Sequence, residues 1–150
     1  MTTPSLPFNP ELLAKIMVDR KIRQQIAGQS HLWFFAIYLN HYIDYELAPF
    51  QKEMFAITED EKTLHAIVMS FRNSAKSTIV TMSYPLWAIL GKQKKKFVVI
   101  IARTQSQAQQ YLRNIRTELE DNEILKRDLG PFEDDKQWGS QGLVLPWHGA

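Results

Sequence analysis

Residues 64–78 decide the fold that this sequence predicts, and they read LHAIVMSFRNSAKST. The first eight residues, 64–71, form a short apolar run rich in types that favour β-strands. A helical pattern follows from about residue 75 to residue 90 and stops at Gly91. Pro85 predicts a kink inside this helix, because proline removes one backbone hydrogen bond. The segment therefore predicts a strand, a turn and a helix, in that order.

The chain beyond this segment repeats the same order. The run FVVIIA (97–102) lacks alternation between apolar and polar residues, which favours a strand buried on both faces of a parallel sheet. Thr104 and Gln107 then form a capping box for a long helix. A shorter helix is expected at 123–129, and 143–145 is a further candidate strand. Strands alternating with helices predict an α/β fold with a parallel sheet and flanking helices. The sheet looks incomplete, because such sheets usually have about five strands.

The residues before the first predicted strand indicate helices only. Asn9-Pro10-Glu11 is a typical helix start, and this first helix is expected to end near Gly28. Ser30 is placed to cap a second helix, and Pro49 to begin a third. The sequence thus predicts a helical N-terminal subdomain at 1–60, followed by the α/β part at 61–150.

The composition limits the classes of function. Apolar residues make up 45% of the 150 residues and charged residues 23%, which is typical of a globular domain. The absence of cysteine excludes disulfides, thiolate zinc sites and cysteine nucleophiles. A net charge of +2 is too small to indicate nucleic-acid binding by itself. The most apolar stretch, 32–39, is shorter than the roughly 20 residues that span a bilayer, so we expect a soluble protein.

The turn at 70–78, SFRNSAKST, resembles a degenerate phosphate-binding loop. Against the pattern G-x-x-x-x-G-K-[ST] it keeps Lys76 and Ser77 but has Ser70 and Ala75 in place of the two glycines. Most residues can supply the backbone N–H groups that cradle phosphates. Lys76 provides a positive charge for the β- and γ-phosphates, and the Ser77 hydroxyl is a ligand for Mg²⁺. The alternative interpretation is that Ser70 to Thr78 forms only a turn between a strand and a helix.

Several segments together resemble one family, the large subunits of bacteriophage terminases, which are ATP-driven motors of DNA packaging. Residues 72–77, RNSAKS, fit that family's degenerate Walker A form, R-x-x-[GA]-K-[ST]. ARTQSQAQ (102–109) is similar to the end of the family's second strand and the helix after it. The stretches 118–123 and 129–132 are similar to the family's segment after that helix. APFQ (48–51) looks like the segment that holds adenine. The resemblance covers about residues 30–145 and implies the N-terminal ATPase portion, with a P-loop NTPase-type parallel sheet.

This resemblance implies a set of site residues. Lys76 and Arg72 are implied as the catalytic residues, with Arg72 stabilising the transferring phosphoryl group. Ser77 is implied to bind Mg²⁺, and Gln51 to contact adenine. The full nucleotide-binding set implied in this way is Phe50, Gln51, Arg72, Asn73, Ser74, Ala75, Lys76, Ser77 and Thr78. On the residues alone, Arg72 is also compatible with pairing to a surface acid, and Gln51 with facing solvent.

The resemblance also implies cofactors, partners and location. The cofactors are ATP and Mg²⁺. The partners are double-stranded DNA, a small terminase subunit and the portal of the procapsid, with an oligomeric ring of this chain in the host cytoplasm. Two alternatives remain from the sequence: another P-loop ATPase, such as a helicase-like translocase, and a non-enzymatic interaction fragment from a truncated prophage gene.

Other residues with chemical potential have weaker patterns. No apolar run ending in Asp follows Lys76, so we expect a chain truncated before the Walker B strand that binds nucleotide weakly and hydrolyses it poorly. The four histidines (31, 41, 65 and 148) lack metal-ligand spacing. The lysines of 92–96 are suited to contacting DNA phosphates, but a solvated turn is the favoured interpretation.

Overall fold

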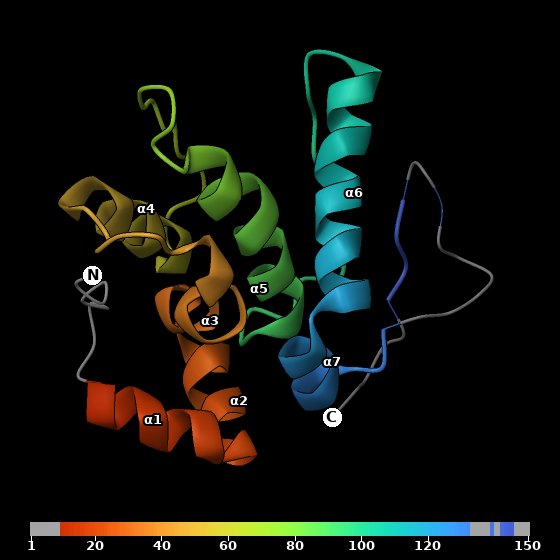
Figure 1. The fold of residues 1–150 in the computed structure, drawn as a ribbon. Helices are drawn as coiled ribbons and strands as arrows, with labels where there is room; N and C mark the ends of the chain where they lie inside the picture. The colour runs from red at the N-terminus through yellow and green to blue at the C-terminus, as the bar shows by residue number, and fades with distance from the viewer. Residues whose placement is uncertain (1–9, 133–138, 140–141, 146–150) are drawn as a thin grey trace. The chain divides into compact units, whose positions relative to one another are not determined.

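The computed structural model of the chain describes residues 10–132, 139 and 142–145. The chain divides into two compact units, Met1–Lys96 and Phe97–Ala150, and each is considered by itself. Figure 1 shows the helices of both units. The first unit contains α1 (Pro10–Val18), α2 (Arg20–Gln29), α3 (His31–Tyr38), η1 (Asn40–Tyr42), α4 (Pro49–Glu59), η2 (Ser77–Ser83) and α5 (Tyr84–Leu90). The second contains α6 (Gln105–Asp121) and α7 (Glu123–Leu129).

Side-chain caps define where α2, α3, α6 and α7 begin. The single helix expected before Gly28 is divided in two, because Asp19 accepts hydrogen bonds from the backbone N–H groups of Lys21 and Ile22 and starts α2. Ser30 caps α3 by accepting from the Trp33 N–H. Pro49 lies at the start of α4, as its fixed φ angle predicts.

Helix α3 forms the centre of the first unit. It contacts α2, α4, η2 and α5. Its residues Phe34, Phe35 and Ile37 are buried, and so are Ala36 and Tyr38. A helix that is apolar on nearly every side is stable only when other elements pack against each of its sides. The surrounding helices therefore pack around α3.

One polar side chain, His31, lies inside this apolar core. Its Nδ1 lies 2.6 Å from the Thr58 Oγ1 of α4, and its Nε2 lies 2.9 Å from the Ser83 Oγ of η2. The imidazole stacks on the Trp87 ring with 5.4 Å between the ring centroids, and the Phe55 ring lies across it in a T-shaped arrangement with 4.8 Å between the centroids. His31 thus joins α3, α4 and the η2–α5 helix at one fully buried point.

The hydroxyl groups around His31 fix its tautomer. The Thr58 hydroxyl donates its proton to the Phe55 carbonyl at 2.8 Å, so its oxygen accepts from the imidazole. His31 therefore carries its proton on Nδ1, and Nε2 accepts a hydrogen bond from the Ser83 hydroxyl. Burial favours this neutral form and lowers the pKa of His31 to about 3.

The helix expected between residues 75 and 90 is present, with a widened first part. Residues 77–83 form π-helical turns, and the Tyr84 N–H donates to the Ile79 carbonyl five residues earlier. Pro85 follows within the first turn of α5. Proline lacks an N–H, and in a regular α-helix its ring would collide with the carbonyl oxygen four residues earlier. The wider π-helical turns before Pro85 remove that collision.

The prediction of an α/β fold with a parallel sheet is wrong. No residue in the described part of the chain lies in a β-strand, and Leu143 forms only an isolated bridge. The runs 64–71 and 97–102 have neither helical nor strand structure, and Ile67, Met69 and Ile101 are each 89% exposed. A strand needs neighbours that pair with its N–H and C=O groups, and a short apolar run does not reveal whether the chain supplies them.

The second unit contains two helices in contact with each other. The Thr104 hydroxyl accepts from the Gln107 N–H at 3.2 Å and begins α6, as predicted, whereas the Gln107 side chain of the expected capping box donates to the Tyr111 hydroxyl. Asn122 ends α6 and starts α7 by accepting from the Leu125 N–H. Ile115, Leu119 and Leu125 are the buried apolar residues on these helices. No helix among the described residues of either unit is long and apolar enough to cross a membrane.

The burial of neutral His31 predicts a loss of stability in mild acid. The folded state has a pKa of about 3 at this group and the unfolded state about 6.5. Between these values the unfolded chain binds a proton that the folded chain does not, so stability falls as the pH falls below 6.5. Lowering the pH from 7.5 to 5.0 should reduce the free energy of unfolding by about 2 kcal/mol through this residue. Urea unfolding at a series of pH values measures this.

His31→Gln is the matched control, because glutamine keeps one donor and one acceptor but does not titrate in this range. Between pH 7.5 and 5.0 the free energy of unfolding of the variant should change much less than that of the parent protein. An equal dependence in both proteins would show that another group is responsible.

Candidate functional site

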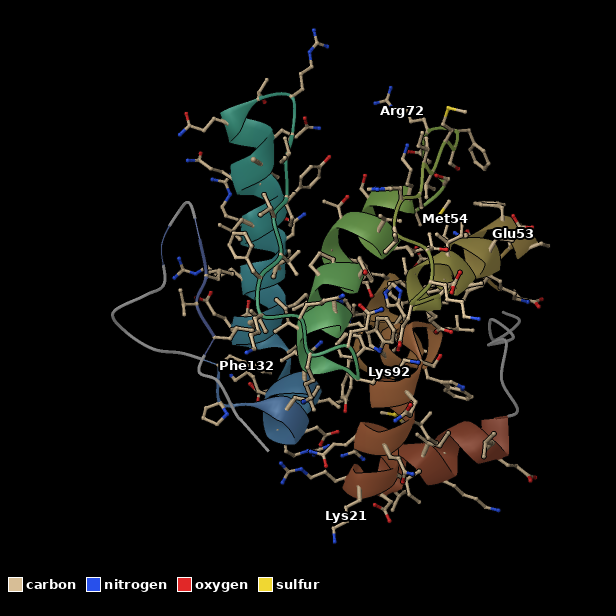
Figure 2. The ribbon with its side chains drawn as sticks, turned by 180° about the vertical axis from the view of Figure 1, so that it is seen from behind. Lys21, Glu53, Met54, Arg72, Lys92 and Phe132 are labelled. Carbon is tan, nitrogen blue, oxygen red and sulfur yellow. The ribbon has the colours of Figure 1, made fainter. Side chains whose placement is uncertain are left out.

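The candidate site is the loop of residues 70–76, which ends where η2 begins. In Figure 1 this loop projects beyond the ends of the neighbouring helices, and Figure 2 shows Arg72 at its outer end. The Arg72 and Asn73 side chains are exposed, whereas Ser74 is only 3% exposed. The loop is thus anchored at Ser74 and open at its tip.

The loop backbone has an unusual conformation. Asn73 and Ala75 have positive φ angles of 67° and 62°, in the left-handed region that glycine adopts without strain. Lys76, the next residue, is right-handed helical with φ −51° and ψ −48°. Adjacent left-handed and right-handed residues turn successive N–H groups toward one point, which forms a concave nest for an anion. Ala75 therefore adopts the conformation that suits the glycine of the phosphate-loop pattern.

Helix α4 holds the loop in place. The Gln51 Oε1 accepts from the Ala48 N–H at 2.9 Å, and the Gln51 Nε2 donates to the Ser74 carbonyl at 3.2 Å. The rings of Phe50 and Phe71 lie 5.2 Å apart, edge to face. The structure therefore brings Phe50 and Gln51 beside the loop. Gln51 does not simply face solvent, and its contact with adenine stays a prediction.

The charged residues of the loop have no partners among the residues that the structure describes. Within the described part of the chain, the Arg72 and Lys76 side chains form no hydrogen bond or ion pair. Arg72 pairs with no surface acid there, although the sequence allowed such a pair. Ser77 is exposed as the first residue of η2, and Thr78 beside it is half-buried. Among the described residues, two cations and one hydroxyl next to the nest therefore have no competing protein partner.

Two features of the structure were not predicted, although the sequence contains signals for them: the hydrogen bonds of Gln51 and the burial of His31. Gln51 lies at the third position of α4, where a side chain that bonds back to the residue before the helix is common. Its second bond, to Ser74 across 23 residues, has no local signal. His31 is a single ionisable residue at the start of an apolar run, and such a residue needs buried partners.

The basic turn after α5 is fixed to the same unit. The backbone N–H of Lys92 donates to the Gly28 carbonyl at 2.8 Å, and that of Lys95 to the Ala88 carbonyl at 2.7 Å. The Gln93 amide donates to the Thr58 carbonyl, and Lys92 pairs with Glu61 at 3.3 Å. The lysine side chains of 92–96 are exposed. A solvated turn stays the prediction for this segment.

Among the described residues no three histidine, aspartate or glutamate side chains gather in a way that holds a metal ion. The chain matches no family model, no curated protein and no solved structure.

The left-handed conformation of Ala75 predicts that Ala75→Gly stabilises the protein. Alanine costs about 1 kcal/mol more than glycine in this region, although glycine also increases the entropy of the unfolded chain. The free energy of unfolding, measured by urea titration, should rise by about 0.5 kcal/mol. Ala56→Gly in α4 is the matched control, since glycine in an exposed helix interior costs about 1 kcal/mol. Equal losses of stability in both variants would contradict the left-handed conformation at Ala75.

Proposed function

We propose that residues 70–78 bind the phosphates of ATP together with Mg²⁺, and that this chain is the ATP-binding part of a viral DNA-packaging motor. The observation that carries the proposal is the left-handed backbone at Asn73 and Ala75, directly before a lysine that no described carboxylate neutralises. The evidence for the proposal is the conformation of the loop itself, and the proposal does not depend on a surrounding sheet.

Each loop residue has a defined role in this proposal. The N–H groups of the nest donate to phosphate oxygens. Lys76 supplies a positive charge to the outer phosphates, and Arg72 supplies a second one where charge develops on the γ-phosphoryl oxygens. Ser77 gives its hydroxyl to Mg²⁺, and Thr78 lies directly beside it. Bound Mg²⁺ neutralises the phosphate charge.

Gln51 and Phe50 are the proposed base-binding residues. A primary amide has two N–H donors and two lone-pair positions. The bonds to Ala48 and Ser74 use one of each, so one donor and one acceptor remain for adenine. Gln51 therefore combines holding the loop with reading the base.

The assignment to a packaging motor comes from the resemblance of RNSAKS and the segments around it to terminase large subunits. In that role ATP hydrolysis drives double-stranded DNA into a procapsid, with a small terminase subunit and the portal as partners. Hydrolysis also needs carboxylates that hold Mg²⁺ and orient water. No Walker B string follows Lys76, so the activity proposed for these 150 residues is nucleotide binding.

A second candidate, a protein-interaction module without nucleotide, is favoured by one observation. Leu64, Ile67, Met69 and Phe71 are all exposed on one short segment. Neighbouring exposed apolar side chains are typical of surfaces that bind other proteins. Dependence of nucleotide binding on Lys76 discriminates between the two candidates.

The proposed function predicts a thermal shift that depends on Lys76. Mg²⁺ and a non-hydrolysable ATP analogue at about 100 times the dissociation constant should add roughly 2.7 kcal/mol to the free energy of unfolding. For a chain of this size the melting temperature should rise by several degrees. Lys76→Ala should abolish the rise, because the charge on the outer phosphates is lost. Differential scanning fluorimetry measures it.

Lys62→Ala is the matched control, because it removes an equal charge from an exposed turn outside the loop. Ser77→Ala should weaken only the part of the shift that requires Mg²⁺. No shift in the parent, or an equal shift in Lys76→Ala, would refute the proposed site.

A further inference from the structure

We propose that His31 is a positioning residue for the phosphate loop. The imidazole bridge from Thr58 to Ser83 sets the spacing of the two helices that hold the loop. This inference rests on the proposed function, because the effect of His31 is on the affinity of the loop for nucleotide.

The loop has two supports in the first unit. On one side α4 holds it through the hydrogen bond from Gln51 to the Ser74 carbonyl. On the other side the chain continues directly from Lys76 into η2. The geometry of the nest therefore depends on where α4 and η2 lie relative to each other.

His31 connects these two supports at the ends that lie away from the loop. Gln51 is in the first turn of α4 and Thr58 in the last, about 10 Å apart along the helix axis. Ser83 is the final residue of η2, whose first residue follows the loop. Hydrogen bonds of 2.6 Å and 2.9 Å join Thr58 and Ser83 through one imidazole ring. The loop and His31 thus connect the same pair of helices at opposite ends.

The bridge is rigid. The fully buried ring is packed between Trp87, on which it stacks, and Phe55, which lies across it. The backbone of His31 is also held to α4, because Glu59 accepts from the Ser30 hydroxyl at 2.7 Å and from the Leu32 N–H at 3.0 Å. The Thr58 and Ser83 hydroxyls each donate in one direction. The two hydrogen bonds of the bridge therefore specify the distance between α4 and η2.

Loss of the bridge has a defined consequence for the loop. Without it, this end of α4 keeps the bond from Gln93 in the turn after α5, but its spacing to η2 is set by packing. Packing tolerates small sliding movements more readily than directed hydrogen bonds do. A binding site loses affinity when its donors move by about half an ångström. Breaking either hydrogen bond of the bridge should therefore weaken nucleotide binding while the chain stays folded.

The test is the dissociation constant of a Mg²⁺-bound, non-hydrolysable ATP analogue, measured by calorimetry well below the melting temperature. Ser83→Ala breaks the bond to η2, and Thr58→Val breaks the bond to α4. Each should raise the dissociation constant roughly two- to tenfold, the factor that corresponds to one hydrogen bond. The double variant should be no weaker than the single ones, because either change already breaks the bridge. His31→Gln, which can span both partners, should recover part of the affinity that His31→Phe loses.

A control separates positioning from stability. Ile16→Val removes a methylene from a buried residue of α1, a helix that packs mainly against α2, and lowers stability. It should leave the dissociation constant unchanged. Unchanged affinity in Ser83→Ala and Thr58→Val as well would overturn the positioning role while the proposed function stands. No binding by the parent chain would overturn both.

Discussion

The first unit depends on how one imidazole is satisfied where three helices meet. Apolar packing brings α3, α4 and the η2–α5 helix together, but such packing permits many small shifts between helices. His31 removes that freedom, because its two nitrogens need partners of opposite kind, and Thr58 and Ser83 supply one each. An unpaired nitrogen at this depth would cost far more than the bonds contribute. The chemistry of a buried polar group therefore specifies the arrangement of helices.

The loop uses the rigidity of this arrangement. Asn73 and Ala75 keep backbone conformations that alanine in particular disfavours, and such conformations persist only where the surroundings impose them. Here the surroundings are Gln51 bonded to Ser74 on one side and η2 on the other. Because these contacts impose the conformation, less order would have to be created when the loop bound the phosphates that we propose.

The parts of the fold that the sequence predicted correctly depend on neighbours in the chain. Pro49, Ser30 and Thr104 mark helix starts, because a cap acts within three residues. The phosphate-loop pattern in the sequence coincides with a segment in which two left-handed residues, Asn73 and Ala75, precede Lys76. The predicted strands were wrong because a run such as FVVIIA reports only that its side chains are apolar, whereas a sheet needs partners from elsewhere. The bonds from Gln51 to Ser74 and from His31 to Thr58 and Ser83 join distant residues, and no local pattern records them.

The junction at His31 also constrains how this sequence can change over evolutionary time. Replacing Thr58 or Ser83 alone by an apolar residue leaves an imidazole nitrogen without its partner, so the single step is costly in either order. Replacing all three positions by apolar residues of similar size removes the polar groups together and costs little. Positions 31, 58 and 83 should therefore be inherited as a set: related chains keep all three polar residues or none, with few intermediates. A trio of positions that vary together would identify this three-helix junction in a distant relative whose loop at 70–76 has changed beyond detection.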